Sequence, residues 1–202
     1  MTIGVLALQG DFAAHLQLLD AHGVATQPVR TAAELEKCDA LIIPGGESTT
    51  MSRLCDRYEL WEPLRTRIAN GMGVFGTCAG MILLAKSITG ASRTFAQKTL
   101  GALDIDVARN AYGAQIESFE ADIEIAGLAG EPVRATFIRA PQVTRVGPDV
   151  EVLARWNDRP VLVRQNHLMA CAFHPEIADE SRIHQLWLES LCRTEVKGLR
   201  TE

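Results

Sequence analysis

Residues 73–85 read GVFGTCAGMILLA, which is a short apolar run, a cysteine between glycines and a second apolar run. This order predicts a buried strand, a tight turn at Cys78 and a helix. The turn has the G-x-C-x-G spacing of a nucleophile elbow, in which small neighbours permit a strained turn that presents one side chain at the end of a strand. We therefore expect Cys78 to be exposed and reactive. The alternative is a buried apolar cysteine between packing glycines.

Strand and helix patterns alternate on the N-terminal side of this elbow. Residues 3–8, 25–29 and 40–43 have the composition of strands, and the last of these is almost wholly apolar, as in a central parallel strand covered on both faces. Phe12, Leu16 and Leu19 mark one face of a helix between the first two strands, which Gly23 ends.

The pattern changes after Gly101 to several short strands separated by turn residues. We expect strands at 123–125, 136–138, 150–154, 160–163 and 169–173. An amphipathic helix follows from Ser181 to Cys192, and the polar tail from Glu195 is expected to fray. The chain is thus predicted to be a single α/β domain, residues 1–202. Its sheet is open and mostly parallel with helices on both faces, and short antiparallel strands are added in the second half.

Composition excludes several classes of protein. The net charge of -5 comes from interspersed charges without a basic stripe, so nucleic acid is not an expected partner. The five cysteines include no C-x-x-C pair, which argues against a disulfide framework or zinc knuckle and fits a reducing cytoplasm. The N-terminus lacks the basic leader of a secretory signal. Residues 68–85 carry no charge, but their four glycines argue against a membrane span.

A thiol nucleophile needs a base, and His174 has the most informative neighbours among the five histidines. Pro175 favours extended backbone at His174, where residues two apart project to the same side, so Glu176 could orient the imidazole. This gives a nucleophile, a base and a carboxylate in the order Cys78, His174, Glu176. The alternative is that His-Pro-Glu merely ends a strand. Its place after an apolar strand favours catalysis, because the carboxyl ends of such strands form the functional edge of an open α/β sheet.

The remaining histidines lack metal-ligand spacing, so we expect His15, His22, His167 and His184 to be surface or packing residues, and no metal site. Gly45 and Gly46 follow a buried strand. Backbone N–H groups of Gly46 and Ala79 could form an oxyanion hole for Cys78, or the two glycines could form a simple turn.

Several segments carry a resemblance to a known family. They read LALQGDF (6–12), PGGEST (44–49), RNAYG (109–113) with Gln115, and FIRAP (137–141). Together with the elbow and His-Pro-Glu, they resemble the glutaminase subunits of pyridoxal 5'-phosphate synthase, which are class I, triad-type glutamine amidotransferases. The resemblance runs from Ile3 to the last helix. The elbow and His-Pro-Glu alone identify only the superfamily.

The resemblance implies a flavodoxin-like fold and hydrolysis of L-glutamine to L-glutamate and ammonia without a cofactor. The ammonia would pass to a separate synthase subunit that assembles pyridoxal 5'-phosphate. The family's glutamine contacts carry over to Gly46, Glu47, Ser48, Arg109, Ile138 and Arg139. Ala114 departs from the basic residue that the family often has there. Two alternatives stay open: the glutaminase of another ammonia-using synthase, or a noncatalytic redox sensor or chaperone on a similar scaffold.

Overall fold

A seven-stranded sheet forms the centre of the computed structural model, which describes residues 1–89, 97–109, 118–178 and 180–198. The strand order is β10-β11-β12-β4-β3-β1-β2. The bounds are β1 (Thr2–Leu6), β2 (Ala25–Val29), β3 (Ala40–Ile43), β4 (Gly73–Thr77), β10 (Glu151–Trp156), β11 (Arg159–Gln165) and β12 (Leu168–Cys171). From β12 to β2 all neighbours are parallel, whereas β10 and β11 extend the sheet as an antiparallel pair.

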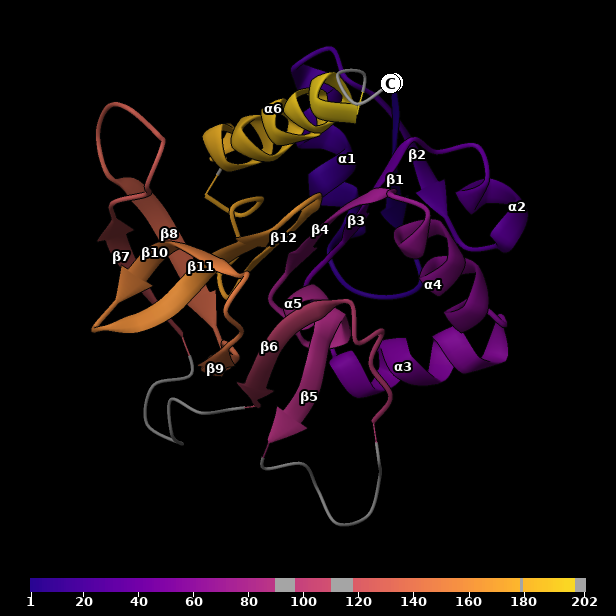
Figure 1. Cartoon of the computed structure of the whole chain (residues 1–202), viewed down its shortest axis with the longest axis horizontal. Coiled ribbons are helices and arrows are strands. Elements are labelled where there is room, and N and C mark those ends of the chain that lie inside the picture. The colour runs from indigo at the N-terminus through magenta and orange to yellow at the C-terminus, as the bar shows by residue number, and fades with distance from the viewer. Residues whose placement is uncertain (90–96, 110–117, 179, 199–202) are drawn as a thin grey trace.

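Helices cover both faces of this sheet (Figure 1). The bounds are α1 (Phe12–Ala21), α2 (Ala32–Leu35), α3 (Ser48–Arg57), α4 (Trp61–Ala69), α5 (Ala79–Leu84) and α6 (Ser181–Gly198). Helices α1 and α6 pack together on one face, while α2 contacts α4 and α3 contacts α5 on the other. Strands β3, β4 and β12 are buried along their whole length because they are covered on both sides.

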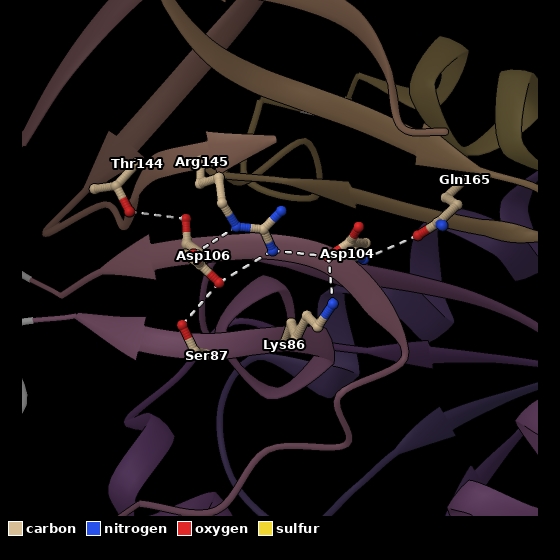
Figure 2. A network of polar contacts seen from close by, with 7 residues as sticks. All are labelled: Lys86, Ser87, Asp104, Asp106, Thr144, Arg145 and Gln165. Atoms are coloured by element: carbon tan, nitrogen blue, oxygen red, sulfur yellow. Dashed lines mark hydrogen bonds and ion pairs between the residues drawn. The ribbon is translucent and has the colours of Figure 1, made fainter. Parts of the chain in front are cut away.

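A smaller three-stranded sheet joins β5 (Ala85–Thr89), β6 (Leu103–Ala108) and β9 (Gln142–Val146). Figure 2 shows how exposed charges connect its strands. The Arg145 guanidinium contacts Asp106 Oδ2 at 2.6 Å and Asp104 Oδ1 at 2.7 Å, and Lys86 Nζ reaches the same Asp104 oxygen at 3.1 Å. The Asp104 N–H donates to Gln165 Oε1 at 2.9 Å, which ties this small sheet to β11.

A two-stranded hairpin, β7 (Ser118–Ile123) and β8 (Val133–Ile138), packs on β10 through aromatic rings. Phe119 stacks on Phe137 with ring centroids 4.6 Å apart, and Trp156 lies 4.3 Å from Phe119. These contacts fix β8, whose last residue, Ile138, lies beside the elbow cysteine.

The predicted α/β class is confirmed, with a mostly parallel sheet, helices on both faces and antiparallel additions. The apolar stretch 68–85 divides into the end of α4, the strand β4 and the helix α5. None of the helices that the structure describes is both long and apolar enough to cross a membrane. The single-domain assignment and the fraying from Glu195 stay predictions.

Several local predictions were wrong. The strand expected at 123–125 lies earlier, at Ser118–Ile123, because it pairs in register with β8. Helix α6 continues past Cys192 to Gly198. The predicted apolar face of α1 is present, since Leu19 is buried and Phe12 and Leu16 are partly buried against the core, but His15 and Leu18 are buried as well. The segment 110–117, with Tyr112, Ala114 and Gln115, lies outside the described residues.

Candidate active site

The elbow at Cys78 joins β4 directly to α5. Cys78 has φ 47° and ψ -99°, a conformation that L-residues adopt rarely and at some cost in free energy. Its N–H donates to the Cys171 carbonyl at 2.8 Å, which anchors the turn to β12. A side chain at Gly80 would collide with the Ile43 carbonyl, so glycine there permits α5 to lie close against β3. The predicted strand, turn and helix are therefore present.

Cys78 is less exposed than the elbow pattern predicted. Only 6% of the residue is exposed, because the cavity walls cover it. Its thiol lies 3.8 Å from the Ile138 carbonyl, toward which it donates, and it borders a cavity that opens to the surface. The sulfur is thus within reach of a small ligand although the residue as a whole is buried.

His174 and Glu176 form a tight pair beside this sulfur. His174 follows β12, and its backbone N–H donates to the Thr136 carbonyl at 2.8 Å. The distance from His174 Nδ1 to Glu176 Oε1 is 2.7 Å, and the Glu176 side chain is fully buried. Burial disfavours the imidazolium, but hydrogen bonds with Cys78 and Glu176 outweigh it and raise the pKa of His174 to about 10. The arrangement favours an imidazolium next to the thiol.

The other cysteines differ from Cys78 in their surroundings. Burial raises the pKa of the Cys171 thiol well above its ordinary value and that of Cys55 to about 12, and it also raises the pKa of Cys38. Such thiols are poor nucleophiles because the thiolate is the reactive form. Cys192 is exposed and lies on α6, away from the pair. Cys78 is the cysteine that combines a histidine partner with a cavity.

The cavity beside Cys78 has a volume of about 320 Å³, enough for an amino acid. Its lining includes every residue to which the family resemblance assigns a glutamine contact: Gly46, Glu47, Ser48, Arg109, Ile138 and Arg139. Cys78 and His174 line it too. Residues from five distant segments therefore converge at the carboxyl ends of β3, β4, β6, β8 and β12.

Residues 5–193 match the SNO glutamine amidotransferase family. This chain belongs to that family. The amidotransferase is 50% identical over 193 residues to "Pyridoxal 5'-phosphate synthase subunit PdxT" of Carboxydothermus hydrogenoformans, covering 96% of this chain and 99% of that one. It is 54% identical over 191 residues to the protein of the same name from Acidothermus cellulolyticus, and the alignment covers 92% of this chain and 91% of that one.

Solved structures agree with this assignment. A crystal structure titled glutamine amidotransferase superimposes with a TM-score of 0.87 at 47% identity, covering 94% of this chain and 98% of that one. The structure of PurLQS from Thermotoga maritima gives a TM-score of 0.67 at 16% identity, with 94% and 98% covered, and shows the shared fold alone. The sequence-based assignment to the glutamine amidotransferases is thus confirmed.

One wall of the amidotransferase cavity is an ion-pair network at the start of α3. Glu47 caps this helix, accepting from the backbone N–H groups of Thr49 and Thr50 at 3.1 and 2.7 Å. Burial acts to raise the pKa of Glu47, but the hydrogen bond from the Thr50 hydroxyl, together with those from the two N–H groups, lowers it overall. Arg109 pairs with the same carboxylate at 3.3 Å and donates to Thr49 Oγ1 at 3.0 Å. Glu47 is thereby held ionised at the cavity mouth.

Arg139 forms part of the opposite wall. It follows β8 directly and has φ 43°, so the chain turns sharply after Ile138. No carboxylate of the described residues pairs with its guanidinium, in contrast to Arg109. A cavity-lining arginine without an anionic partner suits a carboxylate ligand.

The Gly45-Gly46 segment approaches the histidine closely. A side chain at Gly45 would collide with the His174 ring, and Gly46 has φ 154°. Gln9 Oε1 accepts the Glu47 N–H at 2.7 Å and so fixes the end of this segment. Ala79 begins α5, so its N–H belongs to the helix end that lacks intrahelical partners. Their use as an oxyanion hole stays a prediction.

Sequence reasoning missed part of this site. Gln9, Asp11, Ile82 and Ile177 also line the cavity, and the LALQGDF segment was the available signal for the first two. His15 was expected at the surface or in packing, yet it lies 3.4 Å from Glu176 Oε2. Within the described ranges there is no group of three or more His, Cys, Asp or Glu that could hold a metal ion.

Proposed function

We propose that this chain is the glutaminase subunit of a pyridoxal 5'-phosphate synthase, in which Cys78, His174 and Glu176 hydrolyse L-glutamine. The observation that supports this most strongly is the 2.7 Å His174–Glu176 pair beside the elbow thiol in an amino-acid-sized cavity. The names of the relatives supply the biosynthetic context.

Acylation starts with the Cys78 thiolate, which attacks the side-chain amide carbon of glutamine. A C–S bond forms and the carbonyl becomes an oxyanion, which the N–H groups of Gly46 and Ala79 stabilise. His174 then donates its proton to the amide nitrogen, so that the C–N bond breaks and ammonia leaves. The product is a thioester on Cys78. Glu176 keeps the imidazole ring oriented and balances its charge throughout.

Deacylation reverses the roles of the same groups. His174, now neutral, takes a proton from water as the water oxygen attacks the thioester carbon. The second tetrahedral intermediate collapses, the C–S bond breaks and glutamate leaves. The sulfur departs as a thiolate and the imidazole stays protonated, which restores the starting ion pair. The high pKa of His174 suits this resting state.

The substrate is oriented by opposite charges on the two walls. Arg139 binds the α-carboxylate of glutamine, and Glu47 receives its α-ammonium group. Arg109 acts through Glu47, to which it is bound. Backbone groups of Gly46, Ser48 and Ile138 complete the pocket. This division of roles keeps the glutamine side chain directed at Cys78.

The ammonia is consumed by a separate synthase subunit, to which this chain binds. The acceptor reaction joins a pentose phosphate and a triose phosphate to make pyridoxal 5'-phosphate, as the resemblance implies. The reaction requires no cofactor on this chain, and we place it in the cytoplasm, where free thiols persist.

The test is glutamate release from glutamine by the purified chain, with and without the synthase subunit of the same organism. We expect activity that the synthase increases and that depends on Cys78. Pyridoxal 5'-phosphate should form when both sugar phosphates are added. A glutamine-like electrophile should label Cys78, and glutamine should protect it. Glutaminase activity without any effect of this synthase would instead favour the glutaminase of another synthase, and no glutaminase activity would favour a noncatalytic protein.

A further inference from the structure

The two oxygens of Glu176 have different surroundings. Oε1 lies 2.7 Å from His174 Nδ1, as the triad requires. Oε2 is buried and has no hydrogen bond of good geometry among the described residues. Its side chain is fully buried, and a buried carboxylate oxygen without a donor is costly. The nitrogen that faces it is His15 Nε2, at 3.4 Å, on a side chain that is also fully buried.

His15 is itself the middle of a buried chain of polar groups. Its Nδ1 lies 2.9 Å from His184 Nε2, and its Nε2 lies 3.3 Å from the Thr77 hydroxyl. His184 comes from α6 and His15 from α1, so the contact joins the two helices that cover this face of the sheet. The Phe75 ring meets His184 edge to face at 5.5 Å and limits its movement.

The negative charge of Glu176 determines which ring nitrogens of His15 and His184 carry a proton. An ionised Oε2 only accepts, so a lone pair on His15 Nε2 would face it repulsively, whereas an N–H there would be attracted. With the proton on Nε2, His15 Nδ1 is an acceptor and must receive the Nε2–H of His184. One arrangement therefore suits all three contacts: His184 donates to His15, and the His15 Nε2–H is shared between Glu176 Oε2 and the Thr77 hydroxyl oxygen.

We propose that His15 is a positioning residue of the glutaminase triad, which holds Glu176 through its Nε2–H while His184 fixes the tautomer of His15. The inference rests on the proposed function. Catalytic hydrogen bonds are often long before substrate binds and shorten in the reacting complex, which fits the 3.4 Å separation. Because Glu176 orients His174, a carboxylate free to rotate would leave the imidazole less well aligned with the thiol.

Both histidines are neutral in this arrangement, and their surroundings agree with that. Burial, the neighbouring His184 and the His174 charge lower the pKa of His15 well below its ordinary value. Burial likewise lowers the pKa of His184 to about 4. A neutral His15 does not balance the charge of Glu176. It contributes an oriented N–H that holds the carboxylate in position.

The test compares three substitutions at His15 in the complex with the synthase subunit. Gln places an amide donor near the position of Nε2, Asn places one near Nδ1, and Leu supplies none. We expect His15→Leu and His15→Asn to lower kcat by about tenfold to hundredfold, as when partners that orient a functional side chain are removed, with KM for glutamine nearly unchanged. His15→Gln should retain most of the wild-type kcat.

Leu19→Ala is the matched control, because Leu19 is buried in the same helix and has an apolar side chain that belongs to the hydrophobic core. It should lower the unfolding temperature while kcat is retained. A second readout is the rate at which iodoacetamide alkylates Cys78 at neutral pH in the isolated chain. That rate should fall in His15→Leu and His15→Asn but be retained in His15→Gln and Leu19→Ala.

The outcomes separate the two proposals. A wild-type complex that releases no glutamate contradicts the proposed function, and the alkylation rates then still test the position of Glu176. An active wild type in which His15→Leu keeps its kcat contradicts the role of His15. If His15→Leu does not fold, the Gln and Asn variants decide: equal kcat and equal alkylation rates in these two would overturn the proposal, since only one of them can place a donor at Oε2.

Discussion

The catalytic triad and the ion pair at the cavity mouth are held in different ways. Cys78, His174 and Glu176 are all buried, and backbone hydrogen bonds hold Cys78 to Cys171 of β12 and His174 to Thr136 of β8. Glu47 and Arg109, by contrast, meet at the cavity mouth, where 47% of the Glu47 side chain and 25% of the Arg109 side chain are exposed. The reacting groups are thus set by the core, while the groups for recognition are set by an ion pair that faces water.

This difference separates chemistry from binding. Changes in the buried triad should act on kcat, because they alter groups that react or that orient a reacting group. Changes in the groups that bind the substrate's charges should act mainly on KM, because an ion pair in water contributes little to folding and can rearrange around a ligand. The predictions below test this division, beginning with the largest expected effect.

Cys78→Ala should abolish glutamine hydrolysis and leave the fold and synthase binding intact. The variant removes the attacking sulfur but little core volume, and it keeps the β4–α5 turn. Glutamate release and unfolding temperature are the measurements, with Cys192→Ser as the control on an exposed cysteine. Substantial hydrolysis by pure Cys78→Ala would refute the nucleophile assignment.

His174→Asn should lower kcat by orders of magnitude, and Glu176→Gln should lower it less. The first change removes the proton carrier, whereas the second removes only the orienting charge. Steady-state kinetics of both variants with the synthase subunit present would check the order. A larger loss in Glu176→Gln would reverse the two roles.

Much of this site was predictable because its signals are local. The elbow needs small residues next to Cys78, and the pairing of His174 with Glu176 follows from their spacing of two. Contacts between distant segments have no such signal. His15 and His184 meet 169 positions apart, so neither residue reveals the other in the sequence. The exposure of Cys78 was overestimated for the same reason, because its thiol lies against the carbonyl of Ile138 from the distant strand β8.

The prediction of the fold was limited in the same way, because contacts between distant segments leave no local signal. The buried strands β3 and β4 were predicted from their apolar runs, but β5, β6 and β9 were missed. In β6 the buried residues alternate with Asp104 and Asp106, and these two carboxylates pair with Arg145 of β9. Tertiary partners, rather than intrinsic propensity, make these segments strands.

Arg139→Ala should raise KM for glutamine by about tenfold or more with a smaller change in kcat, because a charge-assisted hydrogen bond to the carboxylate is lost. Arg109→Ala should have a smaller effect on KM, since Arg109 acts through Glu47. Steady-state kinetics of wild type and both variants give the KM and kcat values to be compared. Equal KM values in wild type and Arg139→Ala would show that the carboxylate binds elsewhere.

The stability of the protein should fall at alkaline pH through His174. Its pKa is about 10 in the folded state and near 6.5 in an unfolded chain, so the folded state binds the proton more tightly. This stabilisation is complete below pH 6.5 and is lost progressively as the pH rises to about 10. The free energy of unfolding should therefore decline with pH more steeply in wild type than in His174→Asn, by at most about 1.4 kcal/mol per pH unit. Parallel curves of unfolding free energy against pH in the two proteins would contradict this prediction.

Asp104→Asn should have the smallest effect. Asp104 binds Lys86 and Arg145 at the surface of the small sheet, and neither it nor its partners line the cavity (Figure 2). Exposed ion pairs contribute about 0–1 kcal/mol, so the free energy of unfolding should drop by no more than that, and less in high salt. Both kcat and KM should equal the wild-type values. A change in KM would mean that surface charges outside the cavity lining also influence substrate binding, and the division between the triad and the recognition groups would then be too simple.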